Sequence, residues 1–187
     1  MSSEKLQSAF QKFGDLLDTR FSKEVFTTED SVRYTFFYAI SSEFELVPHD
    51  IVLESVHPNI DGHKEIDMLI PEKKDCPELV FEFKYDRKQP SGTNSPRPLK
   101  AGHLFADIFR QFRYKKEHQK SKCFLIYVTD FEQANYYQKR KIGWMIFSIC
   151  QPVKHYKLIR IMSIITLILL SMRQALMKFT NVRYCHV

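Results

Sequence analysis

Asp67, Glu82 and Lys84 are the residues of this chain whose types and spacing are best suited to chemistry. Asp67 lies in the strand-like run 64–70, and Glu82 and Lys84 lie two positions apart in the run 79–85. Because side chains alternate between the faces of a strand, Glu82 and Lys84 share one face. If the two runs pair as a hairpin, all three side chains converge. Two carboxylates can hold a hard divalent cation, and a lysine beside them can orient or deprotonate a water, which suits metal-assisted hydrolysis of a phosphodiester.

Both runs have one face that is expected to be apolar. These apolar residues are Ile66, Met68 and Ile70 in the first run, and Phe81, Phe83 and Tyr85 in the second. Glu65 and Asp67 are expected on the opposite face of the first run. The second run is otherwise apolar, which indicates a central strand buried on both faces. Charges on such a strand are costly unless they are paired, bound to metal or facing a cleft, so a functional interpretation stands beside the simpler one of a solvated face.

The charge of the chain is distributed unevenly. The 187 residues include 28 Lys or Arg and 22 Asp or Glu, a net charge of +6. Residues 133–187 hold nine basic residues and no acidic one, so the first 132 residues carry 19 basic and all 22 acidic residues, a net charge of −3. The basic balance therefore belongs to the tail and is no electrostatic footprint of a nucleic-acid-binding domain.

The cysteines and the first residues limit the functional classes. Cys76, Cys123, Cys150 and Cys185 lack Cys-x-x-Cys spacing and predict neither a zinc site nor a disulfide framework. The first six residues are polar and carry no apolar core of a signal peptide. A reducing cytoplasm is therefore the expected location. The length corresponds to about one domain with a sizeable core.

The periodicity of the sequence predicts alternating helices and strands. Helices are expected over residues 3–20, from about 27 to 44, over 99–116, and from 129 or 130 to about 139. Strands are expected over residues 51–56, 64–70, 79–85 and 123–128. The apolar face of the helix 99–116 is expected at Leu104, Ile108, Phe109 and Phe112. A three-strand meander followed by a helical crossover to a further strand predicts an α/β sandwich with a mixed sheet.

With Asp67 on the second strand and Glu82-x-Lys84 on the third, this order resembles the PD-(D/E)xK nuclease superfamily, which has the restriction-endonuclease-like fold. The resemblance covers about residues 25–135, within a nuclease-like domain of residues 1–140, and Ile66 stands where the motif has proline. It implies an α/β core in the order helix, three strands, helix, strand, with helices flanking a mixed sheet. It also implies a Mg²⁺-dependent DNA endonuclease of the restriction or repair type, in which Mn²⁺ can replace Mg²⁺.

The resemblance assigns roles residue by residue. Asp67 and Glu82 become the metal ligands, together with the backbone carbonyl of Phe83. Lys84 would position the attacking water or stabilise the negative charge that develops on the phosphate. Glu29, in the first core helix, matches an additional acid that many members carry. The helix dipole alone also favours an acid in a first turn, so a purely structural role is the alternative for Glu29.

The segment after the motif strand supplies the expected contacts to DNA. The polar stretch 86–98 is read as a mobile loop, and a solvated linker is its alternative interpretation. The basic residues of this segment that can contact phosphates are Arg87, Lys88, Arg97 and, just beyond it, Lys100. In such nucleases the following helix often places a polar residue near the scissile phosphate. The candidates for that role are Lys100, Arg110 and Gln111.

From about residue 139 the composition of the chain changes. The apolar run 161–172 lies between Arg160 and Arg173, and its 12 residues fall short of the about 20 that a transmembrane helix needs. A buried helix and a dimer contact are the structural interpretations of this run. We favour the hypothesis that the reading frame has shifted near residues 139–145, so that the tail 141–187 is not an evolved part of the fold. No stable membrane insertion is expected.

The sequence therefore predicts a metal-dependent endonuclease that hydrolyses DNA. Cutting both strands usually takes two sites, which favours a homodimer. A catalytically inactive, nucleic-acid-binding relative of the same fold is the alternative. A membrane-associated protein that uses the tail is a third hypothesis, which the short apolar run disfavours.

Overall fold

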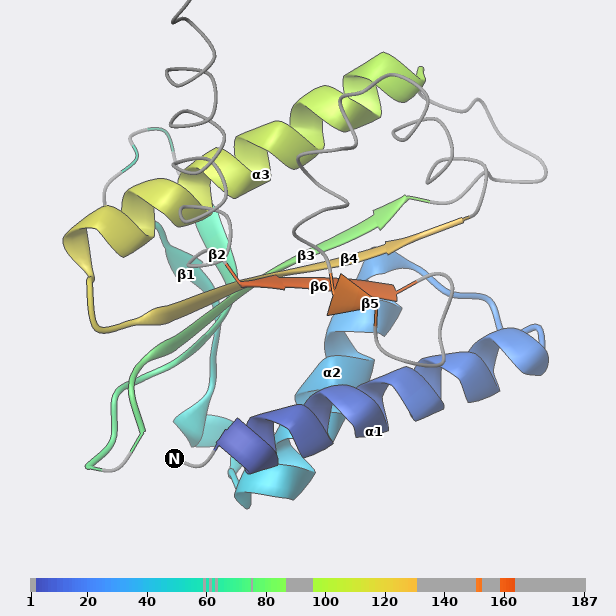
Figure 1. Cartoon of the computed structure of the whole chain (residues 1–187), viewed down its shortest axis with the longest axis horizontal. Coiled ribbons are helices and arrows are strands. Elements are labelled where there is room, and N and C mark those ends of the chain that lie inside the picture. Colours follow the sequence, from blue (N-terminus) through green and yellow to red (C-terminus); the bar gives the residue numbers. More distant parts are fainter. Residues whose placement is uncertain are drawn as a thin grey trace, which may run out of the picture.

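The computed structural model describes residues 3–58, 60, 62, 64–74, 76–86, 96–130, 151–152 and 159–163. The helices are α1 (Ser3–Ser22), α2 (Glu29–Phe44), the short 3-10 helix η1 (Pro48–Asp50) and α3 (Arg97–Glu117). The strands are β1 (Val52–Val56), β2 (Glu65–Ile70), β3 (Leu79–Asp86), β4 (Lys122–Thr129), β5 (Gln151–Pro152) and β6 (Ile159–Ser163). They form one mixed sheet in the order β1-β2-β3-β4-β6-β5 (Figure 1).

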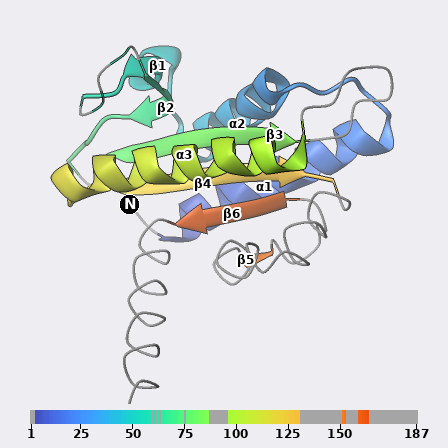
Figure 2. The ribbon, with the colours of Figure 1, turned by 90° about the horizontal axis from the view of Figure 1, so that it is seen from above.

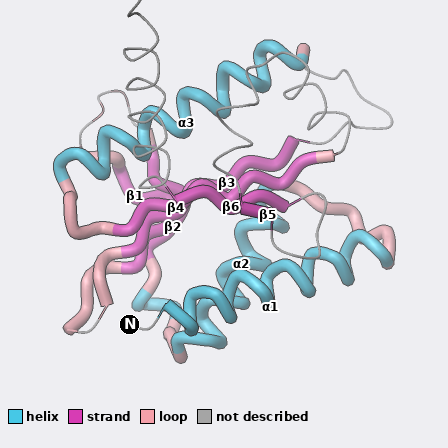
Figure 3. The backbone as a smooth tube through the Cα atoms, viewed as in Figure 1, coloured by secondary structure: helices cyan, strands magenta, loops and turns pink. Residues whose placement is uncertain are grey.

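The molecule has three layers. Helices α1 and α2 cover one face of the sheet and α3 covers the other (Figures 1 and 3). Strands β1, β2 and β3 form an antiparallel meander, and α3 then crosses over to β4, which lies parallel to β3. Seen from above, α3 follows β3 and β4 (Figure 2). The predicted α/β architecture with a mixed sheet and a helical crossover is confirmed.

The start of α2 is fixed by a capping box. The Thr28 hydroxyl accepts a hydrogen bond from the backbone N–H of Ser31 at 3.1 Å, and the Ser31 hydroxyl accepts one from the backbone N–H of Thr28 at 3.2 Å. This reciprocal pair satisfies two of the backbone donors that every helix N-terminus leaves without a partner. Glu29 therefore stands in the first turn of α2, as the sequence predicts.

An aromatic cluster joins α1 and α2 to the sheet. Phe36 is fully buried, and its ring lies 5.6 Å from Phe10, 5.3 Å from Phe13, 4.8 Å from Phe81 and 5.5 Å from Phe83, measured between centroids. Phe10 and Phe13 come from α1, and Phe81 and Phe83 come from β3. The predicted apolar face of β3 is thus confirmed. Helices α1 and α2 pack against this apolar face of β3, and Glu82 and Lys84 lie on the opposite face, which α3 covers.

The predicted apolar face of α3 is wrong for Phe109 and Phe112, whose side chains are 60% and 42% exposed. The residues that α3 buries are Ala101, Leu104, Asp107, Gln111 and Tyr114. The helix lies over the face of β3 that carries charge, so polar side chains of α3 turn inward to meet it. The position of the sheet, rather than the apolar content of the helix, decides which face is buried.

The predicted alternation along β2 is wrong at Ile66. Ile66 packs with Val80 and Tyr114 on the α3 side, whereas Met68 and Ile70 belong to the core beneath α1 and α2. Strict alternation would place all three on one face. The cause is a local distortion of the sheet at Asp67, opposite Glu54 of β1 with its positive φ.

Several predicted features fall partly or wholly outside the described residues. These are Arg87, Lys88, most of the loop 86–98 and the expected helix after Thr129. Residues 161–163, the start of the apolar run, lie in β6 rather than in a helix, and β6 pairs antiparallel with β4. Among the helices that the structure describes, none is long and apolar enough to cross a membrane.

Replacing Phe36 by alanine tests the aromatic cluster. We expect Phe36→Ala to lower the free energy of unfolding by about 3–5 kcal/mol, because four neighbouring rings lose their contact and a cavity remains. Tyr34, on the same helix, is 60% exposed, so Tyr34→Ala is the matched control and should change stability by no more than about 0.5 kcal/mol. Urea unfolding followed by circular dichroism measures both. Equal losses in the two variants would contradict this packing.

Candidate active site

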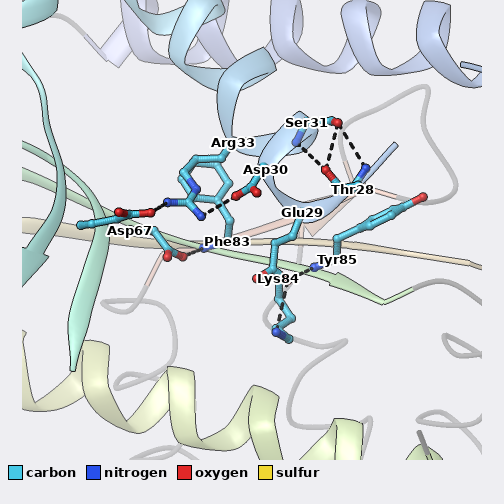
Figure 4. A network of polar contacts seen from close by, with 10 residues as sticks. Thr28, Glu29, Asp30, Ser31, Arg33, Asp67, Phe83, Lys84 and Tyr85 are labelled. Carbon is cyan, nitrogen blue, oxygen red and sulfur yellow. Dashed lines mark hydrogen bonds and ion pairs between the residues drawn. The ribbon is translucent and has the colours of Figure 1, made fainter. Parts of the chain in front are cut away.

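Asp67 lies where the pairing of β2 and β3 stops. The two strands pair Ile70 with Leu79 and continue to Met68 opposite Phe81, and no further. Beyond that point the Asp67 side chain replaces the backbone ladder: its Oδ2 accepts a hydrogen bond from the backbone N–H of Phe83 at 2.7 Å (Figure 4). The carboxylate of Asp67 is thereby fixed beside the Glu82–Phe83–Lys84 stretch of β3, as the predicted hairpin requires.

A strained residue on β1 accompanies this opening. Glu54 has φ +54°, in the left-handed region that non-glycine residues rarely adopt. The register pairs Leu53 with Met68 and Ser55 with Ile66, so Glu54 lies opposite Asp67. Because the backbone turns out of its regular pleat at this point, the alternation of side chains on β2 breaks at the same place. This is the physical reason why the face of Ile66 could not be predicted.

The first two turns of α2 contact the region around Glu54 and Asp67 through Arg33. Arg33 forms ion pairs with Glu54 at 2.9 Å and with Asp30 at 2.7 Å (Figure 4). Burial lowers the pKa of Arg33, but Glu54, Asp67 and Asp30 together raise it above its ordinary value. Arg33 is thus a cation shared between the strained residue on β1 and the acidic residues around it.

Glu29 docks the N-terminus of α2 on β3. Its Oε2 accepts a hydrogen bond from the backbone N–H of Tyr85 at 2.9 Å and lies 3.2 Å from Nζ of Lys84 (Figure 4). Burial lowers the pKa of Lys84, but the carboxylates of Glu29, Asp107 and Asp86 together more than offset this, and the pKa of Lys84 is raised above its ordinary value. Lys84 is therefore held as a cation and is poorly suited to remove a proton from water.

Glu82 is the most constrained of the predicted site residues. Its side chain is buried, with 2% of the residue exposed. Oε2 lies 3.7 Å from the Arg110 guanidinium, and no donor in the described part of the chain reaches the buried Oε1. Burial, and after it the charge of Asp67, raises the pKa of the Glu82 carboxyl well above its ordinary value. The protonated Glu82 carboxyl shares a hydrogen bond with the Asp67 side chain, which also raises its pKa. A buried carboxylate oxygen that no donor reaches, beside a second carboxylate, is an environment that a divalent cation would stabilise.

Asp107 was not predicted from the sequence. It lies on the buried face of α3 and binds Arg110, with 2.6 Å between Oδ1 and Nη2. Its pKa is raised by burial, and its charge acts on both Glu82 and Lys84. The available signal was its i, i+4 spacing to Gln111, which marks two polar residues on one side of a helix that crosses the motif strand. The apolar content of the opposite side concealed it.

The remaining predicted residues are placed unevenly around this centre. Lys100 Nζ lies 3.8 Å from Asp86 at the end of β3, where the Tyr127 hydroxyl also donates to Asp86 at 3.2 Å. Gln111 is buried, and its Oε1 has no hydrogen-bond partner within the described residues. Arg97 is exposed in the first turn of α3. The structure brings Asp67, Glu82, Lys84 and Glu29 together. Of the proposed DNA contacts that it describes, Lys100 and Gln111 lie about three turns apart along α3.

The carboxylates of the site do not form a three-ligand cage. In the part of the chain that the structure describes, no group of three or more His, Cys, Asp or Glu side chains is arranged to hold a metal ion. The predicted set needs only two carboxylates, from Asp67 and Glu82, with the Phe83 carbonyl as a third ligand. Water molecules commonly complete the shell of a Mg²⁺ ion held by one or two carboxylates.

Comparison of the chain with family models, curated proteins and solved structures gives no match. The resemblance to PD-(D/E)xK nucleases therefore stays a prediction that depends on the motif and the order of elements. A functional conclusion has to come from the geometry around Asp67, Glu82 and Lys84.

Substitution of Glu54 tests whether strain is stored opposite Asp67. Glu54→Gly should change the free energy of unfolding by less than about 1 kcal/mol, because glycine adopts positive φ freely and the ion pair to a mostly exposed Glu54 contributes little. Glu54→Val should cost about 1–2 kcal/mol more than Glu54→Gly, because its branched side chain disfavours the left-handed region. Chemical denaturation measures the difference. Ser55→Val is the control at the next position, and a loss there equal to that of Glu54→Val would contradict the strain.

Substitution of Glu82 by glutamine tests the cost of its buried charge. At pH 8 we expect Glu82→Gln to be more stable than the wild type, because the amide keeps the shape and Arg110 retains Asp107. A group whose pKa is raised on folding destabilises the fold as pH rises from its unfolded pKa to its folded pKa, so the difference should shrink towards pH 4.

Each kcal/mol of this gain should raise the thermal midpoint by about 2–4 °C in scanning calorimetry. Glu65, which is exposed on the neighbouring strand β2, gives the matched control Glu65→Gln. A Glu82→Gln variant that is less stable than the control at both pH values would mean that the Glu82 charge does not destabilise the fold.

Proposed function

We propose that this chain is a metal-dependent endonuclease that hydrolyses DNA phosphodiester bonds. The observation that carries the proposal is the buried Oε1 of Glu82, which no donor among the described residues reaches, beside Asp67 and on the same face of β3 as Lys84. A carboxylate in that state destabilises the fold, so its presence on the central strand calls for a cation or a reaction that uses it.

Asp67 and Glu82 would hold the divalent cation, together with the backbone carbonyl of Phe83, the residue that follows Glu82. When bound, the cation would polarise the phosphate and lower the pKa of the attacking water. The hydrogen bond from the Phe83 N–H to Asp67 fixes that peptide against the carboxylate. The same peptide therefore links both acidic ligands, which limits how far they can move apart.

Lys84 acts as a fixed positive charge in this proposal. Burial lowers its pKa, but Glu29 and the nearby aspartates raise it overall, so it remains an ammonium ion at neutral pH. An ammonium beside the reacting phosphate stabilises the negative charge that develops in the transition state and can hold a water by hydrogen bonding. Glu29 then serves to orient Lys84, and no general-base role falls to the lysine.

A specific observation also favours the inactive nucleic-acid-binding relative. The Arg110 guanidinium lies 3.7 Å from Glu82 and 2.6 Å from Asp107, so it supplies positive charge to the carboxylates without a metal. In an active enzyme this cation would share Glu82 with the metal. In an inactive relative it would replace the metal altogether.

DNA cleavage assays separate these two functions. Supercoiled plasmid and phage DNA are incubated with the full chain and Mg²⁺ or Mn²⁺, and nicked and linear products are quantified on gels. Glu82→Gln and Lys84→Met should each lower the cleavage rate by about 100-fold or more, since each removes charge that acts on the reacting phosphate. Glu65→Gln and Lys64→Met, at exposed positions, are the matched controls and should cut as the wild type does.

Fully active Lys84→Met protein would refute the role of the lysine. DNA binding without cleavage in either metal, unchanged in Glu82→Gln, would favour the inactive relative. A homodimer belongs to this proposal because two sites serve two strands, and linear product formed without accumulation of nicked plasmid would support it.

A further inference from the structure

Helix α3 presents two aromatic and two basic side chains to solvent, directly away from the sheet. We define the outer ridge of α3 as Phe109, Phe112, Arg113 and Lys116. All four are exposed, and the two phenylalanines are 60% and 42% exposed. Phenylalanine rings gain by leaving water, so two of them exposed on one helix indicate a surface that binds something.

The spacing of the outer ridge repeats. Phe109 and Arg113 are separated by four positions, and so are Phe112 and Lys116, which places each cation beside a ring on the helix surface. The two rings follow each other by three positions, about 4.5 Å along the helix axis. The ridge is thus two aromatic platforms, each with its own positive charge.

The charge of the ridge selects the kind of partner. At the exposed positions of α3 from Gly102 to Lys116 there is no acidic residue, and Glu117, the exposed last residue of the helix, is the first acid after them. The exposed residues in this span are Gly102, His103, Ala106, Phe109, Phe112, Arg113 and Lys116. The rest of the first 132 residues gives this part of the chain a net charge of −3. A local positive surface on a negative body fits a polyanion rather than an apolar protein partner.

We propose that the outer ridge of α3 binds single-stranded nucleic acid, with successive bases stacked on Phe109 and Phe112 and phosphates contacted by Arg113 and Lys116. Single strands offer open base faces to aromatic side chains, whereas the bases of a duplex are already stacked on each other. The binding surface itself stands on the ridge alone. That the bound strand is a single-stranded segment of the DNA substrate rests on the function proposed above.

The ridge and the candidate active site are carried by the same helix. Asp107 and Arg110 meet Glu82 on the side of α3 that faces the sheet, and Phe109 and Arg113 lie on the far side. A helix with its side chains is about 10–12 Å across, so a strand on the ridge passes within about one helix diameter of the site. The ridge is therefore placed to hold a strand that reaches the acidic residues at the edge of α3.

Binding is measured without metal, so that cleavage plays no part. A fluorescein-labelled 20-nucleotide oligo(dT) is titrated with the full chain in EDTA, and fluorescence anisotropy gives Kd. Phe109→Ala and Phe112→Ala should each weaken binding about tenfold or more, the effect of losing one stacked base. Replacing both Arg113 and Lys116 by glutamine should reduce the slope of log K against log salt by about 1.4, at about 0.7 for each phosphate contact. Tyr34→Ala, an equally exposed aromatic on α2, should bind as the wild type does.

The substituted side chains are exposed, so the variants should fold, and thermal midpoints check this. Three results would overturn the inference: no binding of oligo(dT), equal binding by the phenylalanine variants, or tighter binding of a 20-base-pair duplex. Phenylalanine substitutions that abolish self-association of the chain, and not oligonucleotide binding, would mean that the ridge joins two copies. A protein that binds oligo(dT) through the ridge but cuts no DNA would refute the proposed nuclease and leave the ridge in place.

Discussion

The burial of Glu82 on the central strand is the constraint on which the rest of the site depends. A carboxylate in that position loses its hydration, and Asp67 beside it adds like charge. Arg110 offsets part of this cost, because α3 places its guanidinium beside Glu82 on the same face of the sheet. Arg110 is shared with Asp107, so the compensation is incomplete, and no donor in the part of the chain that the structure describes reaches Oε1. The remaining deficit of positive charge makes the site a candidate for a cation.

The N-terminal turns of α2 contact β1 and β3, the two strands on either side of β2 where the sheet pairing is interrupted. Glu29 binds the backbone of β3 at Tyr85, and Arg33, one turn later, binds Glu54 on β1. Between these two attachments lies Asp67, where the β2–β3 ladder ends. The structural and functional interpretations of Glu29 do not exclude each other. A helix N-terminus favours an acid there, and the same carboxylate, with Asp107 and Asp86, helps to keep Lys84 charged.

The sequence predicts β3 well because its pattern is local. Phe81 and Phe83 are packed against α1 and α2 while Glu82 and Lys84 face α3, as alternation requires. The prediction for Ile66 is wrong because the break in side-chain alternation arises on another strand, at the positive φ of Glu54. The side-chain pattern of β2 gives no sign of a backbone distortion on β1. Asp107 escaped prediction for a related reason. Which side of a helix is buried depends on what the sheet presents to it.

The orientation of α3, which buries polar rather than apolar side chains, connects the site with the outer ridge. If the apolar residues of α3 decided its orientation, Phe109 and Phe112 would face the sheet, and Asp107 and Arg110 would lie in water. Glu82 would then be buried with no cation near it, at a cost of several kcal/mol for an unpaired charge. Turning Asp107 and Arg110 inward relieves that cost and necessarily turns the two rings outward, since they lie on the opposite side of the helix. The exposed aromatic surface is therefore a consequence of neutralising Glu82, and chemistry at the site and binding on the ridge depend on one helix orientation.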